Sequence, residues 1–260
     1  MSRILIYDSG VGNIPIANAI RAELPSAELL LVSDTAFFPY GEKEDGELIL
    51  RAINVLHRAV SELEPDLLVL GCNTLSTIAL EDIRNEFRLP IVGVVPAIKP
   101  AASLSQSKVI GLIATPATIH REYTEQLISE FAADCSVIKV GSTDLVRLAE
   151  DKVSGKQVDK NQLRNILLPF VEARGGQSLD QLVLGCTHFP LLKDEISTLL
   201  EDIEIQDSSA AIGKQVHKIV STLSKNKIIK KTSILSNVYY STNMCGNIIS
   251  TTMPELSTKV

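Results

Sequence analysis

The strongest constraint on the fold is a regular alternation between short apolar runs and longer segments with helical periodicity. Seven runs of strand length are rich in Leu and β-branched residues: Ile4–Tyr7, Glu28–Ser33, Leu67–Leu70, Ile91–Val94, Val109–Ile113, Val137–Val140 and Gln181–Leu184. Over residues 46–63, apolar residues repeat at three- and four-residue spacing, which predicts a helix with one face on a sheet. The repeating residues are Ile49, Ile53, Leu56, Val60 and Leu63. The alternation predicts an α/β fold of βαβ units with mostly parallel sheets.

Two pauses in this pattern divide the chain. The first lies at Pro96–Pro100, before a new strand near Lys108, and the second lies at Asp207–Ser209. With 260 residues and 45% hydrophobic content, the chain has the size at which one core often splits into two. We therefore expect one domain over residues 1–95 plus 210–260 and another over residues 96–209. The Lys-rich segment 224–232 is predicted to be a solvated connector, followed by a strand region over 233–242.

Charge and hydropathy exclude several classes of partner. The net charge of −6 offers no basic surface for phosphate backbones or anionic membranes, so no nucleic-acid partner is expected. The apolar runs are only strand-sized, so we expect neither a signal peptide nor a membrane span. The four cysteines are far apart and form no C-x-x-C pair, which disfavours a disulfide framework, a zinc site or a dithiol. A reducing cytoplasm is the expected location.

A repeat connects the two predicted domains. Leu-Val-Leu-Gly-Cys ends at Cys72 and again at Cys186, and polar residues follow each copy. These polar residues are Asn73, Thr74, Thr187 and His188. Each thiol is therefore expected just past the carboxyl end of a strand, where open α/β sheets bind their ligands. Helices predicted over Leu75–Phe87 and Leu191–Leu200 would point backbone N–H groups at the same place and favour a carboxylate.

Two half-sites with one thiol each suit the inversion of an amino-acid α-carbon. That reaction removes a proton from one face of the carbon and returns one to the other. A free cysteine has a pKa of about 8.5, so its acid and base forms are both accessible near neutral pH. Cys72 and Cys186 are the predicted acid/base pair. The alternative is that both are small buried residues in strands that match by chance.

The neighbours of the two thiols differ. Asp8 ends the first strand and is either a helix N-cap or turn residue, or a proton acceptor or relay beside a thiol. A dinucleotide fingerprint is excluded there because Pro15 occupies its third glycine position. A cationic His188 would favour the thiolate of Cys186. We therefore expect two half-sites with unequal chemistry.

Two further positions have an ordinary interpretation and a functional one. Tyr40 and Gly41 lie in a Pro-Tyr-Gly turn, which is explained by turn chemistry or by anchoring a substrate carboxylate through the hydroxyl and backbone N–H groups. Glu150 is, by its spacing alone, a solvated carboxylate on a helix face. The spacing of these residues does not decide between the alternatives.

Together the motifs resemble the aspartate/glutamate racemase superfamily, and most closely the bacterial glutamate racemases. The matching segments are Asp8–Gly12, Pro39–Gly41, Gly71–Thr74, Gly93–Pro100, Ala114–Thr118 and Leu184–Pro190. The resemblance implies two similar doubly wound, mostly parallel-sheet α/β domains related by pseudo-twofold symmetry. It also implies an active site in the cleft between them, and neither a cofactor such as pyridoxal phosphate nor a metal.

The resemblance also assigns roles to individual residues. Cys72 and Cys186 match the catalytic pair, and Asp8, Glu150 and His188 match auxiliary acid/base positions. The implied substrate contacts are Asp8, Ser9, Tyr40, Gly41, Asn73, Thr74, Thr187 and His188. The implied activity is racemisation of glutamate, which supplies D-glutamate for peptidoglycan in a bacterial cytoplasm. Members are often homodimers, so a second copy of the chain is an expected partner.

The chain departs from the family pattern at a few positions, and other functions stay open. Asn13 stands where a glycine is usual, Leu75 stands where an alanine is usual, and the segment that contains Glu150 matches only loosely. An aspartate racemase would use the same chemistry on a shorter substrate. An amino-acid-binding protein could keep the fold without turnover, and a thiol redox or metal protein is the third alternative.

Overall fold

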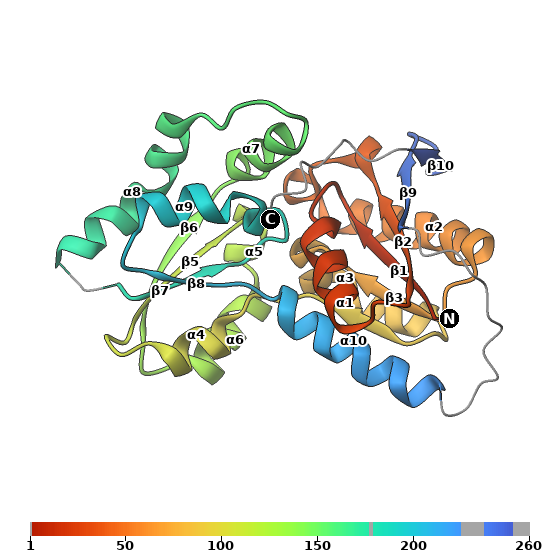
Figure 1. The fold of residues 1–260 in the computed structure, drawn as a ribbon, viewed down its shortest axis with the longest axis horizontal. Helices are drawn as coiled ribbons and strands as arrows, with labels where there is room; N and C mark the ends of the chain where they lie inside the picture. Colours follow the sequence, from red (N-terminus) through yellow and green to blue (C-terminus); the bar gives the residue numbers. More distant parts are fainter. Residues whose placement is uncertain (1, 177–178, 225–236, 252–260) are drawn as a thin grey trace. The chain divides into compact units, whose positions relative to one another are not determined.

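The computed structural model describes residues 2–176, 179–224 and 237–251, and the chain forms two compact units. Unit 1 comprises Met1–Val94 and Ser209–Val260, and unit 2 comprises Val95–Ser208. Each unit is built around one sheet with helices packed on it (Figure 1). Residues 225–232 of the predicted connector and residues 233–236 of the predicted last strand lie outside the described residues. Within the described ranges, no helix has the length and apolar character needed to cross a bilayer.

Unit 1 contains a six-stranded sheet in the order β10-β9-β2-β1-β3-β4. Its strands are β1 (Arg3–Asp8), β2 (Glu28–Ser33), β3 (Leu67–Leu70), β4 (Ile91–Gly93), β9 (Asn237–Thr242) and β10 (Ile248–Thr251). Its helices are α1 (Asn13–Glu23), α2 (Asp45–Leu63), α3 (Asn73–Glu86) and α10 (Ser209–Ser224), with 3-10 helices η1 (Thr35–Phe37) and η2 (Tyr40–Glu42). All strand pairs are parallel except β9–β10, which is antiparallel.

Alternating side chains give the sheet of unit 1 two cores. Successive side chains of a strand point to opposite faces, so a strand that is buried on both faces is apolar throughout. Leu5 and Tyr7 of β1 pack in a cluster with α2 and α3, whereas Ile4 and Ile6 pack in a cluster with α1 and α10. The sheet is therefore doubly wound, with helices on both faces.

The helix predicted over 46–63 forms as α2, but the prediction of its buried face is partly wrong. Ile49, Ile53 and Val60 are only partly buried. The fully buried face consists of Leu48, Ala52, Val55, Leu56, Ala59 and Leu63. Its alanines are too small to stand out in a pattern of large apolar residues, although small side chains are suited to close packing of a helix on a sheet.

Unit 2 contains a four-stranded, all-parallel sheet in the order β6-β5-β7-β8. Its strands are β5 (Val109–Ala114), β6 (Ser136–Gly141), β7 (Gln181–Leu184) and β8 (Glu204–Gln206). Its helices are α4 (Ile98–Leu104), α5 (Pro116–Ile119), α6 (Glu122–Phe131), α7 (Asp144–Val153), α8 (Lys160–Gly176) and α9 (Lys193–Leu199), with the 3-10 helix η3 (Phe189–Leu192). Helices α4 and α6 cover one face of the sheet, and α8 and α9 lie on the other (Figure 1).

The central strands of the two units share one order. In unit 1 the order β2-β1-β3-β4 matches β6-β5-β7-β8 in unit 2, so β3 and β7, the strands that precede Cys72 and Cys186, occupy equivalent places. The seven predicted strands are confirmed within one residue at each end. The edge strands β8 and β10 were not predicted because they are short, contain no fully buried residue and have no long apolar run.

Candidate active site

Cys72 is the N-cap residue of α3, and Gly71 alone separates it from β3. It is buried, with 6% of its surface exposed, and has extended backbone angles that end the strand before the helix begins at Asn73. The N–H of Gly71 donates to the carbonyl of Tyr7 at 2.7 Å. A Cβ at Gly71 would lie only 3.3 Å from that oxygen, so glycine allows the close approach of β3 to β1. The thiol is therefore held at the carboxyl edge of the sheet, as predicted.

Asp8 lies at the same edge, at the end of β1. It is fully buried, and its Oδ1 accepts the N–H of Gly10 at 2.9 Å and the hydroxyl of Ser9 at 3.4 Å. The N-cap of α1 is Gly12, so Asp8 is a turn residue rather than a helix cap. Asp8 thus places a carboxylate at the end of β1, which pairs with β3, the strand that precedes Cys72.

Asn73 contains an unsatisfied acceptor in the first turn of α3. Its side chain is buried, and within the described part of the chain its Oδ1 has no hydrogen-bond partner. A buried acceptor without a partner costs about 1–3 kcal/mol, so this oxygen is available to accept a hydrogen bond from a ligand. Thr74, next to it, is also buried. A substrate ammonium group suits the oxygen of Asn73.

The hydroxyl of Tyr40 has its partners inside unit 1, which favours the structural interpretation of its turn over the functional one. It donates to Asp34 Oδ2 at 2.9 Å and lies 2.5 Å from the hydroxyl of Tyr7. Burial raises the pKa of both phenols well above their usual range, and the carboxylate of Asp34 raises them further, so both remain protonated. The Tyr40 ring is buried, which leaves the backbone of the turn at Tyr40 and Gly41 as the part suited to substrate contact.

Cys186 lies in a different local structure. The Gly185 N–H donates to the Ile113 carbonyl at 2.7 Å, which matches the contact made by Gly71 in unit 1. However, the chain then makes a turn and the 3-10 helix η3, and α9 begins only at Lys193. The helix predicted over Leu191–Leu200 is confirmed as the end of η3 and α9, but it does not begin directly after Cys186 as α3 does after Cys72.

Three predicted residues of unit 2 form a chain of polar contacts. The Sγ of Cys186 lies 3.9 Å from Nδ1 of His188, and Nε2 of His188 lies 2.9 Å from Oε1 of Glu150. His188 is almost fully buried, whereas the side chain of Glu150 is 26% exposed. A carboxylate at Nε2 keeps a proton on that nitrogen, so Nδ1 is available to accept the proton of the thiol. Glu150 is thus not the purely solvated carboxylate that spacing alone suggests.

Lys152 holds the helix that carries Glu150 against the Cys186 turn. Its Nζ donates to the carbonyl of Leu191 and to Oε2 of Glu195, both at 2.8 Å. These bonds connect α7 to η3 and α9. Sequence analysis missed Lys152 because no local pattern connects residues that lie about forty positions apart in the chain. Thr187, between the thiol and the imidazole, is buried in the same turn.

Asn13 and Leu75, which differ from the residues usual in the family, both have structural roles. Asn13 begins α1, and its Nδ2 donates to the hydroxyl of Ser33 at 2.9 Å, while that hydroxyl donates to the Gly10 carbonyl at 2.9 Å. Leu75 is fully buried in the core of unit 1.

All four cysteines are free thiols. Over the described residues, no three His, Cys, Asp or Glu side chains gather into a group that could hold a metal ion.

Known proteins are similar to this chain over most of its length. The family model for Asp/Glu/Hydantoin racemase matches residues 15–216. A glutamate racemase from Shewanella loihica is 44% identical over 234 residues, which cover 90% of this chain and 86% of the relative. A glutamate racemase from Vibrio cholerae is 46% identical over 219 residues, which cover 84% of this chain and 80% of the relative.

Solved structures agree with this relationship. Escherichia coli glutamate racemase, in complex with L-glutamate and the activator UDP-MurNAc-Ala, has a TM-score of 0.85 and 37% identity, and the match covers 94% of this chain and 90% of that one. Glutamate racemase from Aquifex pyrophilus has a TM-score of 0.69 and 31% identity, with 93% and 90% covered. On sequence and structure alike, the chain belongs to the Asp/Glu/Hydantoin racemase family.

Proposed function

We propose that the protein interconverts L- and D-glutamate without a cofactor and uses Cys72 and Cys186 as its two acid/base groups. The observation that carries the proposal is the equivalent position of the two cysteines in sheets of the same strand order. Membership of the racemase family supports the reaction class, and the relatives named glutamate racemase support the substrate. In this proposal one thiol acts on each face of the substrate α-carbon.

The reaction balances with two thiol groups alone. One cysteine, as a thiolate, takes the α-proton and becomes a thiol, and the electron pair of the broken C–H bond stays on the substrate, delocalised into its carboxylate. The other cysteine, as a thiol, donates its proton to the opposite face of the α-carbon and becomes a thiolate. One turnover therefore exchanges the protonation states of the two cysteines and prepares the enzyme for the reverse reaction. Heavy-atom approaches of roughly 3–3.5 Å suit both transfers.

The neighbouring groups assist the two cysteines differently. His188 accepts the proton of Cys186, and Glu150 stabilises the resulting imidazolium at its other nitrogen. Asp8 acts as a proton relay for Cys72, because a carboxylate beside a thiol disfavours the thiolate electrostatically. The scaffold is thus repeated, whereas the proton chemistry of the two half-sites is unequal.

The same geometry supports a proposed set of substrate contacts. Asn73 Oδ1, which lacks a partner among the described residues, accepts from the substrate ammonium group. The hydroxyls of Thr74 and Thr187 and the backbone of the turns at Ser9 and at Tyr40–Gly41 bind the two substrate carboxylates. The product, D-glutamate, supplies peptidoglycan synthesis in a bacterial cytoplasm, and the active form is a homodimer.

The proposal is tested by incubating the protein with L-glutamate in D₂O without added cofactor. We expect loss of optical rotation together with deuterium incorporation at the α-carbon, and a parallel sample of L-aspartate should react much more slowly. Faster reaction of aspartate would identify the substrate as aspartate instead. Binding of glutamate with neither exchange nor inversion would show an amino-acid-binding protein and refute the racemase proposal.

Two variants test the thiols directly. Either Cys72→Ser or Cys186→Ser should abolish efficient racemisation, because a serine hydroxyl is a far weaker acid than a thiol. Thermal unfolding of each variant checks that the loss is not caused by misfolding. Racemisation at the wild-type rate in either variant would remove that cysteine from the mechanism.

A further inference from the structure

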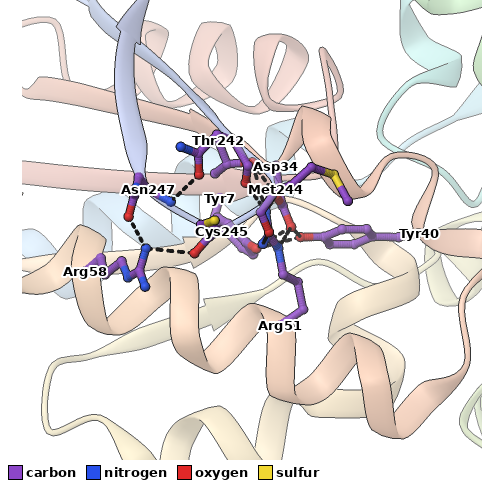
Figure 2. Close-up of polar contacts among 10 residues, drawn as sticks. Tyr7, Asp34, Tyr40, Arg51, Arg58, Thr242, Met244, Cys245 and Asn247 are labelled. Carbon is purple, nitrogen blue, oxygen red and sulfur yellow. Dashed lines mark hydrogen bonds and ion pairs between the residues drawn. The ribbon is translucent and has the colours of Figure 1, made fainter.

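Asp34, a buried carboxylate of unit 1 outside the two cysteine half-sites, makes five polar contacts through its side chain. Asp34 follows β2 and is fully buried, and Arg51 of α2 binds both of its oxygens, with Nε–Oδ2 at 2.9 Å and Nη2–Oδ1 at 2.6 Å. Tyr40 and, more distantly, Tyr7 donate to Oδ2, and the hydroxyl of Thr242 donates to Oδ1 (Figure 2). A buried charge is stable only when it is fully paired in this way.

The contacts of Asp34 reach the C-terminal hairpin, which consists of β9, β10 and the turn between them. Thr242 is the last residue of β9. Arg51 also donates to the carbonyls of Met244 and Asn243, at 2.8 and 2.9 Å. Two helical turns further along α2, Arg58 donates to the Cys245 carbonyl at 2.8 Å (Figure 2). Two arginines on one face of α2 therefore bind the hairpin turn, and only Arg51 also binds Asp34.

The other contacts of Asp34 lead to the proposed substrate site. Its backbone N–H donates to the carbonyl of Asp8 at 2.8 Å. Its side-chain partner Tyr7 immediately precedes Asp8, and its partner Tyr40 immediately precedes Gly41. Asp34 thus binds the two segments that carry Asp8–Ser9 and Tyr40–Gly41. The other unit 1 residues assigned to the substrate, Asn73 and Thr74, follow β3.

We propose that Asp34, Arg51 and Thr242 are positioning residues, through which the C-terminal hairpin holds the substrate-binding turns after β1 and β2 in place. This inference rests on the proposed racemase function. The proposed function assigns none of the three to proton transfer, so we expect them to act on substrate binding more than on proton transfer. Loss of one donor leaves a buried carboxylate underpaired, and the turns bound to it lose their fixed geometry.

The test uses variants of Thr242, because this residue connects the hairpin directly to Asp34. Thr242→Val keeps the shape of the side chain and removes the hydroxyl, and we expect KM for glutamate to rise roughly fivefold with kcat changed by less than about twofold. Thr242→Ser keeps the hydroxyl and should restore the KM of the wild type. Ser241→Ala is the matched control, since residue 241 points to the opposite face of β9 and should leave KM unchanged.

Arg51→Lys provides an independent test. Lysine keeps the charge but cannot bind Asp34 and the two hairpin carbonyls simultaneously, so KM should again rise while kcat is largely retained. Kinetics are measured well below the melting temperature of each variant. Lower melting temperatures with unchanged KM would show a merely structural network and overturn the inference alone. An inactive wild-type protein would overturn the proposed function and this inference together.

Discussion

Replacing Glu150 by glutamine tests the asymmetry between the two half-sites. The substitution keeps the shape of the side chain and removes its charge. In the structure Oε1 of Glu150 lies 2.9 Å from Nε2 of His188, whose other nitrogen faces the sulfur of Cys186. If His188 accepts the thiol proton, the carboxylate stabilises the imidazolium that forms. Glutamine removes this stabilisation and also permits the wrong imidazole tautomer.

The magnitude follows from the distance and the exposure. Two unit charges about 4 Å apart attract by about 1 kcal/mol in water and by about 4 kcal/mol at an effective dielectric constant of about 20. Because His188 is almost fully buried but Glu150 is 26% exposed, we expect about 1–2 kcal/mol. This corresponds to a roughly 5–30-fold loss of kcat/KM. The loss should be equal for L- and D-glutamate, because the two enantiomers have the same free energy in water.

The assay is steady-state racemisation followed in both directions by circular dichroism. Asp151→Asn is the matched control, since it makes the same charge change on the next residue of α7, where Asp151 pairs with Lys156. The control should keep kcat/KM within about twofold of the wild type. If Glu150→Gln also kept its kcat/KM while His188→Asn lost activity, the carboxylate would have no electrostatic role and the reasoning would be refuted.

Three further predictions concern packing, binding and pH. Gly185→Ala should lower the free energy of unfolding by about 1–3 kcal/mol in urea, because its Cβ would lie 2.9 Å from a side chain of β5, whereas Gly46→Ala in open space on α2 should be neutral or stabilising. Asn73→Ala should raise KM for glutamate roughly tenfold, and an unchanged KM in steady-state assays would exclude the proposed ammonium contact. The raised pKa values of Tyr7 and Tyr40 mean that the folded state retains phenol protons that the unfolded state releases above about pH 10. The free energy of unfolding should therefore fall as the pH rises above about 10, and Tyr7→Phe should weaken that dependence in denaturation curves.

Much of the scaffold was predictable from local sequence. Strands buried on both faces leave continuous apolar runs, so their bounds were found within one residue, and Gly-Cys at the end of two such runs identified one sheet edge in each unit. The same rule identifies Asp34 as a polar residue directly after β2, although sequence analysis did not apply it there. Cys186 and His188 are close in the chain, so their proximity also followed from spacing.

The contacts of single side chains were decided by tertiary structure. Local spacing could not show that Glu150 meets His188, that the Tyr40 hydroxyl turns to Asp34, or that Arg51 binds a hairpin about 190 residues later. The sequence by itself determined the alternation of strands and helices, and with it the edge where the thiols lie, because backbone periodicity and burial leave a regular local pattern. Only the folded chain decided which charges pair, because a buried charge takes its partner from whichever element packs beside it, whatever the distance along the chain.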